Sequence, residues 1–230
     1  MNQKLFNIRS IVQLTVFIII IPLLPVLISS KWAWVEGYIY ALINTSGFIV
    51  SRYLAARKYP GILEERAKML KHENTESFDK ILAPLAGLGG LIIVMVIGFE
   101  ARLNGDIVYS LPVKIAGFFA LLFGFTFGTW ALVENRYFSS VVRIQSERGH
   151  QVVSTGPYSI VRHPGYAGAI IMYLGTPLLL DSLWGFIPVL FSIAVLIVRT
   201  VFEDKTLQQK LTGYQKYTKR VRYRLLPPVW

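Results

Sequence analysis

Residues 81–99 read ILAPLAGLGGLIIVMVIGF and carry no charged side chain. Residues 111–133, LPVKIAGFFALLFGFTFGTWALV, form a second apolar run in which Lys114 is the only charge. A helix of about 20 predominantly apolar residues is long enough to cross a bilayer. Both stretches are therefore predicted to be transmembrane helices, and the chain is predicted to be an all-α membrane protein.

Two further apolar runs precede these stretches. Residues 11–29 contain no charge, and residues 32–50 carry only Glu36, near one end. The first run could also be the core of a signal peptide, but residues 29–34 offer no small-x-small cleavage site. We therefore expect an uncleaved first helix followed by a second span.

A shorter pair of apolar runs lies toward the C-terminus. Residues 166–180 and 184–198 contain 15 uncharged residues each, separated by Asp181-Ser182-Leu183. As a helix, each would cover about 22 Å. We interpret the pair as a helical hairpin with arms of equal length, whose inner ends extend into polar sequence. The predicted fold is a polytopic helical bundle of about six spans, or five if the hairpin does not fully cross, with a C-terminal cytosolic helix.

The composition agrees with a membrane protein. Hydrophobic residues make up 53% of the 230 residues and charged residues 16%, with a mean hydropathy of +0.49. Soluble domains average about a quarter charged residues. The net charge of +11 on so apolar a chain is typical of cytosolic flanks of membrane spans rather than of a nucleic-acid binder. The absence of cysteine excludes disulfides, thiolate metal sites and cysteine nucleophiles.

The basic residues indicate the orientation. Two lie before residue 11, seven at residues 51–80, four at residues 135–165, and eight from Arg199 onward, which makes 21 of the 24. The other three are Lys31, Arg102 and Lys114. Because basic residues concentrate in cytosolic segments, both termini and the three polar segments are predicted to be cytosolic. The connector at residues 51–80 is expected to touch anionic headgroups, with an interfacial helix at residues 61–70.

The segment at residues 148–168, RGHQVVSTGPYSIVRHPGYAG, has an unusual composition for a connector. Its prolines and glycines force turns. Within those turns lie two histidines, two tyrosines and two arginines, directly before an apolar run. Tyrosine and arginine could simply anchor the membrane interface. Two histidines without a suitably spaced carboxylate do not indicate a metal, and none is expected.

A second polar cluster follows the hairpin. Arg199, Glu203 and Leu207 are spaced four apart and share one helix face. The arginine and glutamate could pair with each other and reach toward the interface. The hairpin should also return this helix to the His163 turn, and ionisable groups gathered at that depth indicate a functional site.

These two clusters contain recognisable motifs. Gly156-Pro157-Tyr158 and the sequence RHPGYAG at 162–168 resemble the G-x-Y…R-H-P-x-Y-x-G signature of the isoprenylcysteine carboxyl methyltransferase family. The sequence EDKTL at 203–207, with Tyr214 and Tyr217, is similar to the family's E-E-x-x-L…Y-x-x-Y ending. The resemblance covers about the C-terminal 90 residues and indicates a prokaryotic-type member. Asp204 replaces the second glutamate of the family motif, and the ending at residues 221–228 is unlike that of the eukaryotic enzymes.

The resemblance implies that S-adenosyl-L-methionine is bound without a Rossmann fold. It implies that residues 135–230 form a catalytic, cofactor-binding region and that residues 1–134 hold the N-terminal transmembrane helices. Donors such as His163 or Tyr166 would suit the methionyl carboxylate, and Glu203 its ammonium group. By position, the cofactor-binding residues would be His150, Gln151, Val152, Val153, Tyr158, His163, Pro164, Gly165, Tyr166 and Glu203.

The resemblance also implies an acceptor site and a reaction. Arg199 matches the family's substrate-contacting arginine, so Arg199 and Glu203 are the catalytic candidates, and Arg199 and Arg162 the substrate-binding candidates. The methyl group would pass to a lipophilic acceptor that enters from the bilayer, with a carboxylate as the preferred nucleophile. Positioning and desolvation would supply most of the rate, because the nucleophile is already ionised.

Two other functions remain open. Membrane sterol-type reductases resemble this family in their C-terminal half and use NADPH; Arg143, Arg148 and Arg162 could then hold its 2′-phosphate. A transporter or helical scaffold would instead place ionisable residues in mid-span and repeat its halves. Here the charges cluster at one face and the halves do not repeat.

Overall fold

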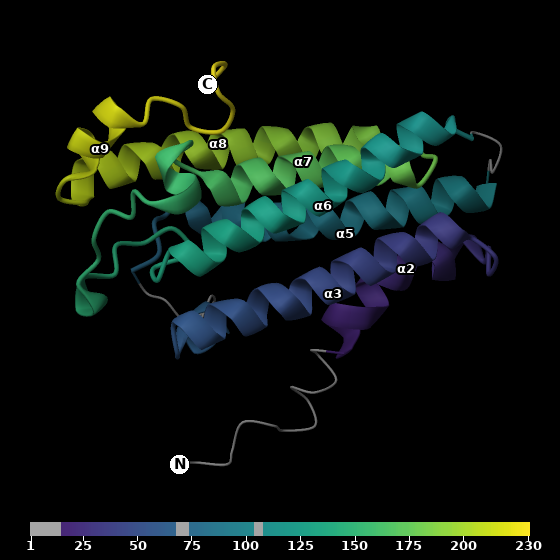
Figure 1. Ribbon diagram of the computed structural model, residues 1–230, viewed down its shortest axis with the longest axis horizontal. Coiled ribbons are helices and arrows are strands. Elements are labelled where there is room, and N and C mark those ends of the chain that lie inside the picture. The colour runs from purple at the N-terminus through teal and green to yellow at the C-terminus, as the bar shows by residue number, and fades with distance from the viewer. Residues whose placement is uncertain (1–14, 68–73, 104–107) are drawn as a thin grey trace, which may run out of the picture.

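The computed structural model describes residues 15–67, 74–103 and 108–230. In this part of the chain, long helices run side by side along one axis and no strand is present (Figure 1). The elements are η1 (Val16–Ile20), α2 (Ile21–Ser29), α3 (Val35–Lys58), α4 (Ile62–Ala67), α5 (Asp79–Leu103), α6 (Leu111–Glu134), η3 (Ser146–Arg148), η4 (Gly156–Ser159), α7 (Pro164–Leu179), α8 (Phe186–Lys210) and α9 (Tyr214–Arg220). The predicted all-α fold is confirmed.

The helices follow the apolar runs, with differences in length. By length and composition, α5, α6 and α8 could each cross a membrane. The first run corresponds to η1 and α2, which ends where Ser30 adopts a left-handed conformation, φ 57°. Residues 11–14 of that run lie outside the described part. The count of six spans therefore stays a prediction.

The hairpin differs from expectation because its arms are unequal. Helix α7 has 16 residues, whereas α8 has 25 and continues past Val198 to Lys210. The reason lies at the polar ends of the two arms. Helix α7 begins only at Pro164, directly after a turn, whereas the polar sequence after Val198 contains no helix breaker before Leu211, so α8 continues through it. The expected extension into polar sequence thus occurs in α8. This extension carries Arg199, Glu203 and Asp204 beyond the apolar half of the helix.

Small residues let α6 and α7 pack closely. A Cβ atom at Gly168 of α7 would lie 2.6 Å from the carbonyl oxygen of Gly124 in α6, and one at Gly175 would lie 2.8 Å from that of Gly117. Glycine at these positions permits backbone contact, as in other closely packed membrane helices. The last glycine of the RHPGYAG sequence therefore positions α7 against α6.

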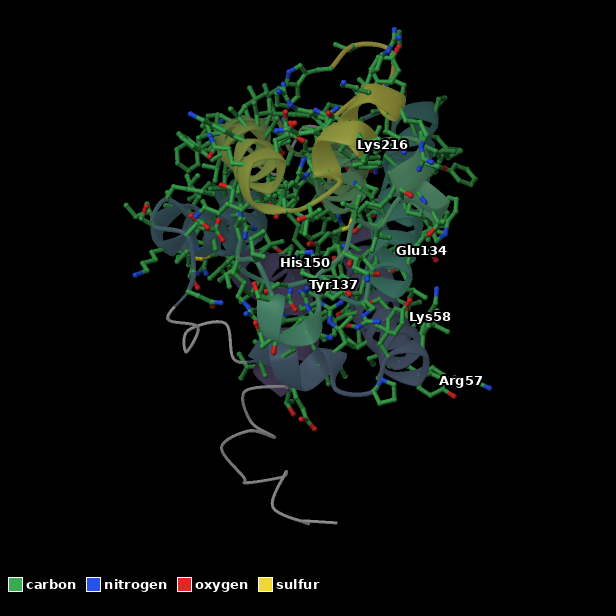
Figure 2. All side chains as sticks on the ribbon, turned by 90° about the vertical axis from the view of Figure 1, so that its left-hand side faces the viewer. Arg57, Lys58, Glu134, Tyr137, His150 and Lys216 are labelled. Atoms are coloured by element: carbon green, nitrogen blue, oxygen red, sulfur yellow. The ribbon has the colours of Figure 1, made fainter. Side chains whose placement is uncertain are left out.

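The two ends of the bundle differ in character. At the end that holds the α7–α8 turn, the Lys114 ammonium lies 2.6 Å from Glu36 and 2.7 Å from Asp181. At the opposite end, the short elements α4, η3, η4 and α9 and the C-terminal tail gather over the helix ends (Figures 1 and 2). The helix expected at residues 61–70 is present as α4, and residues 68–70 lie outside the described part. This end is called the polar end below.

Candidate active site at the polar end

Turns and the C-terminal tail hold the RHPGYAG segment in place. Gly156 has a φ of +55°, and a Cβ atom there would lie 2.9 Å from the indole nitrogen of Trp130, so only glycine fits this turn. Pro164 is the first residue of α7, where its missing N–H costs little. The backbone N–H groups of Arg162 and His163 donate to the carbonyls of Tyr223 and Arg224, at 3.0 and 2.9 Å.

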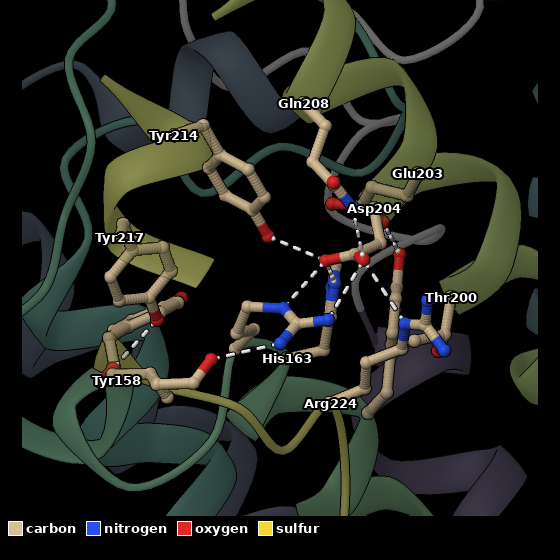
Figure 3. Close-up of polar contacts among 12 residues, drawn as sticks. Tyr158, His163, Thr200, Glu203, Asp204, Gln208, Tyr214, Tyr217 and Arg224 are labelled. Atoms are coloured by element: carbon tan, nitrogen blue, oxygen red, sulfur yellow. Dashed lines mark hydrogen bonds and ion pairs between the residues drawn. The ribbon is translucent and has the colours of Figure 1, made fainter. Parts of the chain in front are cut away.

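Asp204 is the centre of the polar network (Figure 3). Its buried carboxylate accepts two hydrogen bonds from the Arg162 guanidinium, at 2.8 and 2.9 Å. Four further side chains contact the same carboxylate: Tyr214 at 3.0 Å, Gln208 at 2.9 Å, Arg224 at 3.1 Å and His163 at 3.3 Å. With so many partners, Asp204 holds α7, α8, α9 and the tail together.

Glu203, the neighbour of Asp204, faces a different environment. Its Oε2 atom accepts a hydrogen bond of 2.5 Å from the hydroxyl of Tyr166 in the first turn of α7. The guanidinium carbon of Arg199 lies 5.3 Å from the centre of the same tyrosine ring. The two polar clusters therefore meet, as the sequence predicts. Arg199 and Glu203 share one face of α8, and both contact Tyr166.

Arg199 has a carboxylate partner that the sequence did not indicate. Its Nε and Nη2 atoms donate to the two oxygens of Asp79 at 2.7 and 2.9 Å, and Nη2 also donates to the carbonyl of Ser140 at 2.9 Å. Asp79 is the first residue of α5 and is fully buried. The possible Arg199–Glu203 pair is therefore replaced by an Arg199–Asp79 pair, and the charge of Arg199 is internally neutralised.

His150 forms a separate group with Tyr137 (Figure 2). Their ring centres lie 4.5 Å apart, and His150 Nδ1 accepts the N–H of Gln145 at 3.3 Å. Burial, and then the positive charges of Arg143 and Arg148, lower the pKa of His150 from 6.5 to about 4. The imidazole is therefore neutral at pH 7. With Nδ1 acting as acceptor, its proton is on Nε2, which can serve as a donor.

Other cofactor candidates lie in the segment of the chain between His150 and the start of α7. Gln151 is exposed, and Val153 is half-buried. Val152 packs against the cluster of Leu211, Tyr214, Tyr217 and Val221. Tyr158 is buried: its hydroxyl contacts Asn135, and its carbonyl accepts a bond of 2.6 Å from Tyr217. Figure 3 shows Tyr158 and Tyr217 together on one side of His163.

A cavity of about 490 Å³ lies between α3, α5, α6 and α7, with Ile18, Ile21 and Pro22 of η1 and α2 also lining it. Its walls are mainly apolar and include Phe48, Leu91, Phe125 and Met172. Gly165 of the RHPGYAG segment, which packs against Phe138, also lines it. Among the described residues that line it, Arg52 and Arg66 are the two that carry a full charge. The volume is within the range of small-molecule sites.

Some of the predicted site residues have structural partners. Arg162 is buried in the pair with Asp204 and also donates to the carbonyls of Val221 and Arg222. His163 contacts Asp204 and stacks on Tyr166, with 5.8 Å between ring centres. Across the described residues, no three His, Asp or Glu side chains gather as a metal site would require.

The roles of Asp79 and Arg66, and the central position of Asp204 in the network, were not predicted from the sequence. The signal for Asp204 was present, since a carboxylate adjacent to Glu203 points to another side of the helix. Asp79 and Arg66 lie in a mixed-charge connector that resembles solvated sequence. The burial of Asp79 and of the Nη1 atom of Arg66 depends on packing between distant segments and leaves no local pattern.

Comparisons with known proteins agree with the motif. Residues 113–213 match the family model described as phospholipid methyltransferase. A probable protein-S-isoprenylcysteine O-methyltransferase of Oryza sativa subsp. indica is 35% identical over 87 residues, which are 38% of this chain and 36% of that protein. Delta(14)-sterol reductase TM7SF2 of Mus musculus is 36% identical over 90 residues, which are 38% of this chain and 22% of that protein. The chain thus spans about a fifth to a third of these curated relatives.

The fold comparison extends over most of the chain. The structure of the eukaryotic intramembrane Ras methyltransferase ICMT, isoprenylcysteine carboxyl methyltransferase, superposes with a TM-score of 0.54. The match covers 97% of this chain and 88% of that one, at 16% sequence identity. At this identity the similarity shows a shared membrane fold, including the N-terminal helices that the motifs do not reach.

Proposed function

We propose that this chain is a membrane methyltransferase related to the isoprenylcysteine carboxyl methyltransferase family, on the basis of the family-model match, the curated relatives and the shared fold. The reaction transfers a methyl group from S-adenosylmethionine to a lipophilic acceptor, with a carboxylate as the preferred nucleophile. The observation that carries the proposal is the position of Tyr166 and Glu203. They form a polar pair next to Gly165, which lines the apolar cavity. A water-soluble donor and a lipid-like acceptor would meet at such a boundary.

The side chains at the polar end suit the donor. Bound S-adenosylmethionine supplies an electrophilic methyl group on a sulfonium ion. Within the described residues, Glu203 has one carboxylate oxygen held by Tyr166 and no partner for the other, so it can accept a bond from an ammonium group. Neutral His150 offers an Nε2–H donor for a carboxylate. Val152 and Val153 provide half-buried apolar surface for an adenine ring.

The acceptor would enter the cavity sideways from the bilayer. The cavity is bounded by α3, α5, α6 and α7, of which α5 and α6 are long and apolar enough to cross a membrane. Excluding water from the cavity end near Tyr166 strengthens the attraction between a sulfonium and an anionic nucleophile. In this proposal the polar end, with both termini, lies on the cytosolic side, where the soluble donor is available.

Arg199 has a positioning role in this scheme. It lies over the Tyr166 ring while paired with Asp79. Through these two contacts Arg199 fixes the orientation of the tyrosine that binds Glu203. Three of the five N–H donors of Arg199 go to Asp79 and Ser140, so a direct bond from Arg199 to the acceptor would have to come from Nη1.

The match to a delta(14)-sterol reductase supports a second candidate, an NADPH-dependent reductase. The arginines that would bind the 2′-phosphate already have internal partners. Arg143 contacts Glu65 and lies 2.7 Å from Glu147, and Arg162 is paired with Asp204. Arg148 donates to the side chain of Gln145 at 2.5 Å and to the carbonyl of Arg136 at 2.9 Å. This arrangement favours the methyltransferase.

One titration separates the two candidates. Purified protein in non-ionic detergent is titrated by calorimetry with S-adenosylhomocysteine and with NADPH. S-adenosylhomocysteine is the product that remains when the methyl donor has lost its methyl group. The methyltransferase predicts micromolar binding of the former and none of NADPH. Binding of NADPH alone would establish the reductase instead.

A further inference from the structure

Arg66 is half-buried and differs from the buried arginines at the polar end. Arg143, Arg162 and Arg199 each form an ion pair with a carboxylate. Arg66 stacks its guanidinium over the Phe138 ring, 5.1 Å from the centre. Its Nη1 atom is buried and has no hydrogen-bond partner among the described residues. The Nε atom of Arg143 is also without one, but the charge of that guanidinium is paired with Glu65 and Glu147. Burying a charged donor without a hydrogen-bond partner costs free energy, and in folded proteins such donors are normally paired.

The position of Arg66 adds to this imbalance. Its neighbour Glu65, the closest acidic residue in the sequence, is engaged by Arg143. Burial lowers the pKa of Arg66 to about 10, and the positive charges of Arg52 and Arg199 contribute to that lowering. The guanidinium is still protonated at pH 7. A negative charge beside Arg66 would accept a hydrogen bond from its Nη1 atom and would offset the repulsion between these cations.

Arg52 lies in the same wall of the cavity. It comes from α3, stacks 4.3 Å from the Phe48 ring centre, and donates to the hydroxyl of Ser51 at 3.1 Å. Arg52 and Arg66 are thus both held by aromatic rings, with guanidinium donors left for a ligand. Arg66 stacks on Phe138, whose ring packs against Gly165 of the RHPGYAG segment, so this end of the cavity adjoins the candidate active site.

The rest of the cavity is suited to an apolar chain. Apart from the two arginines, its lining consists of aliphatic, aromatic and small residues with a few neutral polar groups. Two cations at one end of an apolar cavity match an amphiphile with an anionic head and a hydrocarbon tail. A neutral lipid would leave the Arg66 donor unsatisfied, and a cationic one would add to the repulsion.

We propose that Arg66, assisted by Arg52, binds the anionic head of the methyl acceptor, whose apolar chain occupies the cavity between α3, α5, α6 and α7. The inference rests on the proposed methyltransferase function and names the substrate class: single-chain or branched amphiphiles with a carboxylate or phosphate. It assigns recognition of the negative charge to the connector after α3 instead of Arg199, whose charge Asp79 neutralises.

The test is a binding assay that requires neither S-adenosylmethionine nor enzymatic turnover. Purified protein in non-ionic detergent is titrated with oleate, monooleoyl phosphate and oleyl alcohol, which share one chain and differ in head group. Displacement of a fluorescent fatty alcohol reports binding. The variants are Arg66→Gln, Arg66→Lys and, as a matched control, Arg57→Gln, an exposed arginine near the end of α3 (Figure 2).

We expect the wild-type protein to bind at least one of the two anions about tenfold more tightly than the alcohol. Arg66→Gln should abolish that difference while leaving alcohol affinity unchanged, which also shows that the cavity is intact. Arg66→Lys should restore part of it, and Arg57→Gln should have no effect. The anion that shows the preference identifies the head as carboxylate or phosphate.

Two results would overturn the inference: equal affinity for anions and alcohol in the wild type, or an anion preference that persists in Arg66→Gln. Binding of S-adenosylhomocysteine by the same preparation tests the methyltransferase proposal separately. Donor binding without an anion preference would refute only the role of Arg66. An anion preference without donor binding would refute the proposed enzyme while leaving the anionic amphiphile site.

Discussion

Tyr166 and Glu203 are 37 residues apart in the sequence, yet the tyrosine hydroxyl donates to the glutamate carboxylate at 2.5 Å. The bond joins the first turn of α7 to the polar extension of α8, the two segments that carry the family motifs. It orients one carboxylate oxygen and leaves the other for a ligand.

Glu203→Gln should weaken S-adenosylhomocysteine binding by about 10- to 100-fold, because a charge-assisted bond to the ligand ammonium is lost. Tyr166→Phe should weaken it by about tenfold, since the carboxylate is then less well oriented. Isothermal calorimetry on both purified variants measures the change. Wild-type affinity in both variants would remove the pair from the donor site.

Asp204→Asn should act mainly on stability, in contrast to Glu203→Gln, which should act mainly on ligand binding. The substitution keeps the shape of the side chain but removes the charge that Arg162 pairs with, deep in the protein. Removing one partner of a buried ion pair costs about 3–5 kcal/mol. Thermal unfolding in detergent, compared with Glu203→Gln as the adjacent control, measures the effect. Equal melting temperatures for the two variants would contradict a structural role for Asp204.

His150 should make stability depend on pH below neutrality. In the folded protein its pKa is lowered to about 4, mainly by burial, whereas an unfolded histidine titrates near 6.5. The unfolded state therefore binds more protons between these values, and stability falls as the pH drops from 6.5 to 4. His150→Gln should remove that part of the loss, as measured by melting temperature across this range. Identical profiles for both proteins would show that His150 titrates normally.

Sequence reasoning succeeded where the signal is local. The apolar run at residues 81–99 became α5, and the i, i+4 spacing placed Arg199 and Glu203 on one face of α8. The turn-forming residues Gly156 and Pro164 begin η4 and α7. These features follow from hydropathy, helix periodicity and backbone chemistry over a few residues.

Ion pairs between residues from distant segments could not be predicted from the sequence. The pair of Arg199 with Asp79 spans 120 residues, and that of Arg162 with Asp204 spans 42. A charge that is neutralised inside the protein cannot be distinguished in the sequence from one that awaits a ligand. Arginines that the motifs suggested as ligand contacts are therefore largely engaged, whereas Arg66, in an unremarkable connector, retains an unpaired donor.

Gly168→Ala should destabilise the protein although the change is small. The new Cβ atom would lie 2.6 Å from the carbonyl oxygen of Gly124 and 2.8 Å from the backbone nitrogen of Gly128, so α6 and α7 would have to separate. Overpacking of this kind costs about 1–3 kcal/mol. Gly128→Ala is the matched control, because a Cβ there meets nothing within 4 Å. Equal melting temperatures for the two variants would show that the helices adjust freely.

The orientation of the bundle gives the last prediction. The chain has no cysteine, so a single introduced cysteine is the only thiol available for labelling. Ser146, exposed in η3 at the polar end, and Val108, 71% exposed before α6 at the other end, are suitable positions. Because 21 of the 24 basic residues lie in the segments assigned to the cytosol, Ser146→Cys should resist a membrane-impermeant maleimide in intact cells. It should react once the cells are opened.

Val108→Cys should show the reverse pattern and react in intact cells. The two variants control for each other, since both thiols are exposed on the protein and differ only in the side of the membrane they face. Labelling of Ser146→Cys from outside, with protection of Val108→Cys, would invert the topology. The donor site would then face away from the cytosolic supply of S-adenosylmethionine, and the proposed methyl transfer would lose its cosubstrate.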